Sequence, residues 1–326
     1  MTVSIPKRFF KSGFKAAPLF LVCVLYYVIM AFVAPGFFSA NNSWNLLFNM
    51  MPLLILALGQ TFVMIGGGID LSVTSSIALT SVVGALVMTS GIVSNPIGIT
   101  VLALLVMIGV GGAIGLVNGV AVTRFKMPPF MVTLVTMMFF SGIAIWLTAS
   151  QSIHDLPEPF VNFSYNTVLG IPNPLLAGVG VTLCCWLLAQ KTIYGRWMFA
   201  VGANPKAAQI SGVPYQQTLV ITYMISGLCG ALASFLYTSR LETGSPVMGQ
   251  YVLLDIIGAV VIGGTSLFGG SGKMIWTVIG TLFLVMLDNS LNLLGLSFFV
   301  IMICKGLVIL IAALLNVAAA RKAKTT

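Results

Sequence analysis

The sequence predicts an all-α polytopic membrane protein with about ten transmembrane helices. Hydrophobic residues make up 59% of the 326 residues, and charged residues make up only 6%. A soluble domain carries about a quarter charged residues, so this composition excludes a soluble globular chain. A helix crosses the hydrocarbon with about 20 apolar residues. The length therefore allows about ten spans in a single transmembrane domain, residues 1–326.

Apolar runs bounded by polar residues, glycine or proline give the candidate spans. The run at 251–264 is short, which indicates a broken or re-entrant helix. Segments 57–67 and 254–264 resemble each other, and each ends in a glycine-rich break, which indicates an internal repeat. The first run follows a basic start and is long for a signal peptide, so we expect a retained span. The runs are 17–34, 46–65, 72–90, 97–122, 129–149, 174–190, 219–238, 251–264, 274–293 and 297–317.

The positions of the basic residues predict that both termini face the cytoplasm. With the N-terminus inside and alternating spans, every lysine and arginine except Arg240 and Lys305 falls on the inner side. The inner segments include a basic N-terminus at 1–16 and a basic tail at 318–326. The net charge of +9 therefore reflects topology. The sequence has no basic stripe with interleaved aromatic residues, so it gives no indication of nucleic-acid binding.

The stretch GGTSLFGGSGKM at 263–274 ends like a phosphate-binding loop. That loop needs a glycine, then four residues, then Gly-Lys and a serine or threonine, but Leu267 and Met274 occupy the first and last of these positions. The flanks are apolar, so we expect no nucleotide here; any ATP would be hydrolysed on another chain. The cysteines lie in apolar runs and His154 is the only histidine. We therefore expect no catalytic site, metal or cofactor.

Two polar residues accompany glycine-rich points. Three glycines at 66–68 would interrupt a helix, and Asp70 follows with Ser72. Asp70 is either a structural cap of the next helix or an element of a gate or path. Glycines 111, 115 and 119 share one helix face and predict close helix packing. Asn118 beside them is expected to bond a neighbouring helix or a passing polar solute.

The longest polar stretch, 191–218, is expected to lie in the cytoplasm. Its segment GANPKAAQISGVP predicts a short helix, because Asn204 is a suitable N-cap, Pro205 suits the first turn, and Gly212 suits the position past the end. Such a helix either contacts nothing or docks on a soluble partner.

Three charged residues lie in apolar runs: Asp255, Asp288 and Lys305. A lone charge in the bilayer costs about 2.5–3.5 kcal/mol, so these residues should pair or face water. We expect an Asp288–Lys305 pair between successive spans. Three interpretations remain open: a structural ion pair, a relay for ion coupling, and a polar lining for a hydroxylated solute together with Asn289 and Asn292. The second would suit an ion-coupled secondary transporter of a small polar solute.

Four stretches resemble the membrane permease subunits of the ribose/galactose-type ABC sugar importers. They are GGGIDLSV at 66–73, LVNGVAVTRFKMPPFMVTL at 116–134, YGRWMFAVGANPKAAQISGV at 194–213 and IGAVVIGGTSLFGGSGKMIWTVIG at 257–280. The resemblance covers nearly the whole chain. It implies a multi-pass protein of the bacterial inner membrane that forms the path for a monosaccharide.

The resemblance also implies partners. These are an ATP-binding cassette ATPase subunit, a periplasmic sugar-binding protein, and a second permease chain, identical or paralogous. The segment around 202–212 would dock on the ATPase. The coupling positions implied are Gly202, Asn204, Ala207, Ala208 and Gly212.

Overall fold

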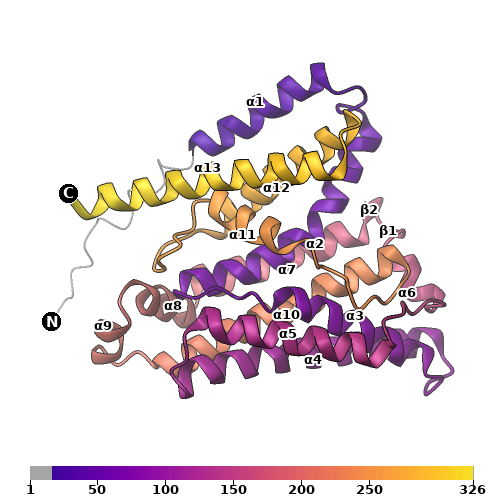
Figure 1. Ribbon diagram of the computed structural model, residues 1–326. Coiled ribbons are helices and arrows are strands. Elements are labelled where there is room, and N and C mark those ends of the chain that lie inside the picture. The colour runs from indigo at the N-terminus through magenta and orange to yellow at the C-terminus, as the bar shows by residue number, and fades with distance from the viewer. Residues whose placement is uncertain (1–16, 326) are drawn as a thin grey trace.

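The computed structural model describes residues 17–325 and is almost entirely helical (Figure 1). The basic N-terminus expected at 1–16 lies outside the described residues. Each of the ten apolar runs forms a helix. These are α1 (Ala17–Val33), α2 (Ala40–Ile65), α3 (Val73–Thr89), α4 (Pro96–Arg124), α5 (Pro129–Thr148), α7 (Asn173–Lys191), α10 (Tyr215–Leu241), α11 (Leu253–Ile262), α12 (Met274–Leu293) and α13 (Phe298–Thr325).

Seven of these helices are long and apolar enough to cross a membrane, namely α2, α4, α5, α7, α10, α12 and α13. The helices α1, α3 and α11 are shorter. With ten residues, α11 is about 15 Å long, half of the hydrocarbon thickness. This agrees with the broken helix expected at 251–264. The composition and these helices define a multi-pass membrane protein.

Short elements fill the connections. Between α5 and α7 lie α6 (Glu158–Phe163) and an antiparallel hairpin of β1 (Thr167–Val168) and β2 (Ile171–Pro172). Between α7 and α10 lie α8 (Ile193–Ala203) and α9 (Pro205–Ile210). The sequence predicts α9 but not α8. The helix α13 continues through most of the basic tail expected at 318–326.

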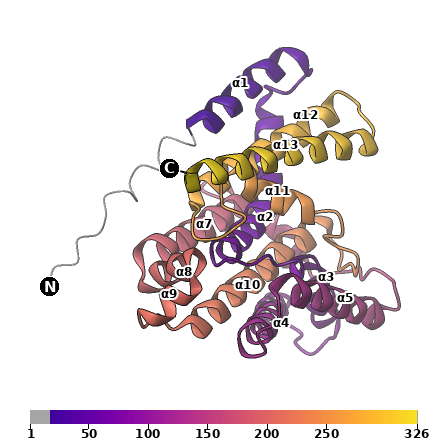
Figure 2. The same ribbon diagram turned by 60° about the vertical axis from the view of Figure 1, so that its left-hand side comes forward.

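Two views show the arrangement in space. In both, α1, α12 and α13 lie on one side of the molecule, α4 and α5 lie on the other, and α2 and α10 run between them (Figures 1 and 2). The central helix α2 is buried along most of its length, whereas only 6% of the apolar window of α13 is buried. The exposed apolar faces of α5 and α13 are therefore surfaces for lipid or another chain.

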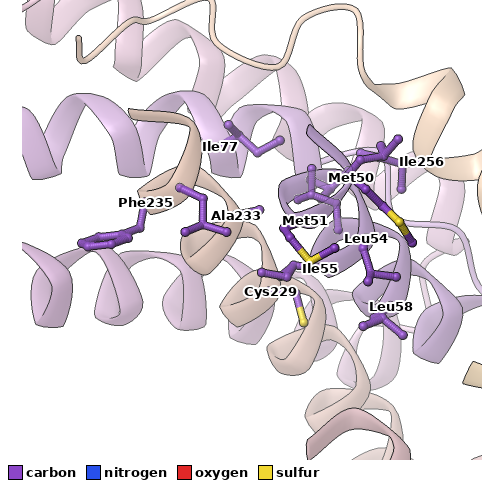
Figure 3. Packing of buried hydrophobic residues seen from close by; sticks show 14 of the residues in the cluster. Met50, Met51, Leu54, Ile55, Leu58, Ile77, Cys229, Ala233, Phe235 and Ile256 are labelled. Carbon is purple, nitrogen blue, oxygen red and sulfur yellow. The ribbon is translucent and has the colours of Figure 1, made fainter. Parts of the chain in front are cut away.

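The core centres on the second half of α2. Met51 and Ile55 of α2 pack with Ile77 of α3, Cys229 of α10 and Ile256 of α11 (Figure 3). The side chains come from the consecutive helices α2 and α3 and from the distant helices α10 and α11, so burial of this cluster fixes α3, α10 and α11 around α2.

The glycine face of α4 packs against α10, as the sequence predicts. A Cβ at Gly119 would lie 2.7 Å from the Val220 Cα, and side chains at Gly111 and Gly115 would collide with carbonyl oxygens of α10. Only glycine permits this approach between the two backbones. The interface fixes the position of Asn118, which lies on the same part of α4.

The helices α2 and α11 end in the same backbone geometry. Gly67 has φ +87° and Gly264 has φ +76°, a region that favours glycine. In both turns the amide after this glycine donates to the carbonyl five residues earlier, at 2.9 Å after α2 and 3.2 Å after α11. The two glycine-rich breaks are confirmed, and the similar segments at 57–67 and 254–264 share one local conformation.

Candidate functional site

Three glycine-rich segments meet where α2, α8 and the 263–273 connection come together; we call this contact the glycine junction. The Gly270 amide donates to the Ile65 carbonyl at 2.9 Å. A Cβ at Gly269 would lie 2.8 Å from the Gly202 carbonyl oxygen and 2.9 Å from the Gly67 Cα. A Cβ at Gly202 would collide with the Ile65 carbonyl. The end of α2, the GGSGK turn and the end of α8 are therefore joined backbone to backbone.

The short helix expected in the coupling segment is confirmed as α9. The Asn204 Oδ1 accepts the Ala207 amide at 3.1 Å, and Pro205 opens the helix. Gly212 has φ +81°, and the next amide returns to the Ala208 carbonyl at 3.0 Å. These local bonds end α9 after six residues and turn the chain into α10.

The helix α8 positions α9. The sequence predicts only a polar connection in this part of 191–218. Its N-cap is Thr192, whose hydroxyl accepts the Gly195 amide at 3.1 Å. The Thr192 cap and the apolar residues of 193–203 are the sequence features that indicate this helix. Because α8 ends at the glycine junction, α9 is attached directly to the end of α2.

The five positions at which the resemblance implies coupling differ in exposure. Gly202 and Ala208 are buried, whereas Asn204, Ala207 and Gly212 are exposed. The neighbouring Ile210 is 89% exposed, although it is apolar. A partner can therefore reach Ala207 and Ile210, while Gly202 and Ala208 act inside the chain.

Asp70 lies in a buried network at the break between α2 and α3. Its Oδ1 accepts the Ser72 amide at 2.9 Å and the Ser72 hydroxyl at 2.6 Å, and its Oδ2 accepts the Ser226 hydroxyl of α10 at 2.7 Å. Only 2% of Asp70 is exposed. The carboxylate ties the start of α3 to α10, and in this conformation it faces no open path.

Asn118 belongs to the same network. Its Nδ2 donates to the Ser72 hydroxyl at 2.7 Å, and its Oδ1 accepts the Thr136 hydroxyl of α5 at 2.7 Å. Asn118 is fully buried. Of the two partners expected for it, the structure shows neighbouring helices.

Lys305 lies between two carboxylates, and we call these three residues the ion triad. Its Nζ lies 2.7 Å from Asp255 Oδ2 and 3.1 Å from Asp288 Oδ1. The expected Asp288–Lys305 pair is present, but the closer partner is Asp255, which the sequence did not pair. The triad joins α11, α12 and α13 and has one formal negative charge in excess. The side chain of Asp288 is 45% exposed.

The two asparagines of α12 have different partners. Asn289 and Asn42 of α2 exchange a reciprocal pair of amide bonds, each 2.9 Å long. Asn292 donates to the backbone and carboxylate of Asp288. Asn292 is therefore hydrogen-bonded to the ion triad, whereas Asn289 links α12 to α2.

A cavity of about 1170 Å³ lies beside the glycine junction, and we call it the α9 cavity. Its walls are the ends of α2, α4 and α8, the helix α9 and the start of α10. Lys126, Lys206, Gln209 and Gln216 contribute polar groups, and Tyr223 lies on the same wall as the glycines that end α2. The sequence does not predict this cavity, because its lining residues come from four separated stretches, 63–68, 122–129, 201–223 and Phe268.

Helices interrupted at glycine-rich points are common in membrane transporters. A family model described as "Branched-chain amino acid transport system / permease component" matches residues 42–314. The chain belongs to this family of permeases.

Curated relatives agree over nearly the full length. The chain is 40% identical to the ribose import permease protein RbsC of Bacillus subtilis, over 91% of each chain. It is 33% identical to the D-allose transport system permease protein AlsC of Escherichia coli K12, over 90% of each chain. It is 32% identical to the L-arabinose permease AraH of the same organism, over 95% of this chain and 94% of AraH. The resemblance to ribose/galactose-type ABC importer permeases is confirmed. No solved structure matches the chain.

Proposed function

We propose that this permease forms the translocation path for a monosaccharide that a periplasmic binding protein delivers, with ATP hydrolysed by a separate cassette subunit. The ten helices are proposed to be ten spans of the bacterial inner membrane, with both termini in the cytoplasm. A second permease chain, identical or paralogous, would complete the path. The relatives named for ribose, allose and arabinose support a sugar substrate.

The proposal rests on two features of α9, its exposed face and its attachment to α2. Its exposed face presents Ala207 and the apolar Ile210, and its base is joined to α2 through the glycine junction. An ATPase docked on this face would therefore act on the end of a central helix. A docked ATPase would cover Ile210, which is 89% exposed.

Co-purification tests the proposal. We expect the tagged chain, extracted in mild detergent from its native membrane, to bring down a stoichiometric ATPase with an intact phosphate-binding loop. The variant Ala207→Glu/Ile210→Glu should bind this ATPase at least about tenfold more weakly, since an unpaired carboxylate buried in an interface costs several kcal/mol. Solute-stimulated ATP hydrolysis should fall with it.

The matched control is Leu169→Glu, at a residue that is 97% exposed in the hairpin at the far end of the molecule from α9 (Figure 1). It should keep the ATPase. Recovery of the chain alone, or unchanged binding by the α9 variant, would contradict the proposal. Ion-gradient-driven uptake by the isolated chain would then favour the secondary transporter, with the ion triad as its coupling site.

A further inference from the structure

We propose that the α9 cavity is a binding site for a phosphate-bearing ligand. Two lysines line it, Lys126 after α4 and Lys206 on α9. In the part of the chain that the structure describes, the ion pairs involve only Lys305, so neither lysine is neutralised. Among the described lining residues there is no aspartate or glutamate. The cavity is therefore positively charged.

The hydroxyl of Tyr223 supplies a second and independent observation. It is buried, the residue being only 1% exposed, and it has no hydrogen-bond partner among the described residues. It lies against Gly68, which lines the same cavity. A buried hydroxyl without a partner is costly. A ligand oxygen would satisfy the hydroxyl once the cavity wall that covers it moved aside.

The balance of donors and acceptors selects the ligand class. Lysine ammonium groups donate only, and lysine commonly binds phosphate as a point charge. A neutral sugar could bond the amides of Gln209 and Gln216, but it would leave the two ammonium charges uncompensated. A phosphate ester mainly accepts, which matches Lys126, Lys206 and Tyr223. The volume of about 1170 Å³ exceeds that of most small-ligand sites, about 300–1,000 Å³, so a phosphorylated sugar or a lipid headgroup fits.

The geometry also gives the site an effect. Lys206 and Gln209 lie on the face of α9 that lines the cavity, whereas Ala207 and Ile210 do not line it. A ligand bridging Lys126 and Lys206 would hold α9 against the end of α4. For this effect and for the cytoplasmic position of the cavity, the inference rests on the proposed function. In that position, cytoplasmic phosphate esters and lipids of the inner leaflet can reach the cavity.

The test is a calorimetric titration of the full chain in nanodiscs of neutral phosphatidylcholine. The probes are a pentose 5-phosphate, inorganic phosphate and the same pentose without phosphate. We expect the phosphorylated probes to bind and the plain pentose to bind at least about tenfold more weakly, because charge-assisted bonds are the strong ones. Lys126→Gln/Lys206→Gln should abolish binding, and Tyr223→Phe should weaken it a few-fold.

The control variant Lys191→Gln/Arg196→Gln removes two neighbouring basic residues outside the cavity and should bind normally. A second arm measures, by native mass spectrometry, the phosphatidylglycerol retained by each variant. Phosphate-ester binding lost only in the cavity variants supports a soluble ligand; lipid retention lost only in them supports a headgroup. Loss of neither, equal loss in the control, or equal binding of the plain pentose overturns the proposal. The titration uses the permease alone, so it does not depend on whether an ATPase associates.

Discussion

At the scale of single residues, the buried polar groups mainly form hydrogen bonds between helices. Asp70 accepts from Ser72 and Ser226, and Asn118 bonds Ser72 and Thr136. The bonds occupy both oxygens of Asp70 and both amide atoms of Asn118. If either residue serves the translocation path, these bonds must exchange during transport, since an unsatisfied buried polar group costs about 1–3 kcal/mol.

Gly202 gives the sharpest prediction at this scale. The variant Gly202→Ala should lower the free energy of unfolding by about 1–3 kcal/mol, the usual effect of overpacking, because its Cβ would collide with the backbone carbonyl of Ile65. Thermal unfolding of the purified chain measures the effect. The control is Gly109→Ala on α4, where a Cβ meets nothing within 4 Å and alanine favours the helix. Equal unfolding temperatures for the two variants would contradict the close contact at the glycine junction.

At the scale of elements, the ion triad holds the short helix α11 against α12 and α13. Lys305→Met should lower the free energy of unfolding by up to about 3 kcal/mol, a value reduced from that of a fully buried pair because Asp288 is half exposed. The triple variant Asp255→Asn/Asp288→Asn/Lys305→Met should recover part of this loss, since no uncompensated charge remains. Denaturant or thermal unfolding compares the two. A triple variant as unstable as Lys305→Met would show that charge compensation is not the role of the triad.

The elements also show what the sequence could and could not specify. Helix positions follow from apolar runs, because burial in lipid needs a continuous run. The ends of α9 follow from Asn204, Pro205 and Gly212, whose bonds are local. The sequence predicts that Lys305 must pair, but two carboxylates compete for it, and only the packing of α11 makes Asp255 the closer one.

The contacts between distant segments could not be predicted from the sequence, because they depend on how the helices pack. The glycine junction joins residues that lie far apart in sequence, and glycine leaves no side-chain pattern from which to pair them. The α9 cavity is built from four separated stretches, and no local pattern in any of them indicates that they meet. Local chemistry was thus predictable, whereas the site formed by assembly was not.

At the scale of the whole molecule, the glycine junction constrains the topology. Gly269 and Gly270 contact Gly202 and Ile65, so we propose that the 263–273 connection lies on the same side of the membrane as α9. The chain between them would then cross an even number of times. With α10 as one proposed span, α11 would complete the return together with the irregular segment 242–252, although the helix itself is only about 15 Å long.

Cysteine labelling tests this topology in a chain whose five native cysteines are replaced. With a membrane-impermeant maleimide on intact spheroplasts, Leu169→Cys in the hairpin should react. Ile210→Cys and Ser271→Cys should react only in inverted vesicles, because α7 separates Leu169 from α9 and the junction joins 271 to α9. Phe139→Cys, on the exposed apolar face of α5, should stay unlabelled from both sides if lipid or another chain covers that face. Labelling of residues 210 and 271 from opposite sides would remove α11 from the spans, and with it the placement of both termini in the cytoplasm.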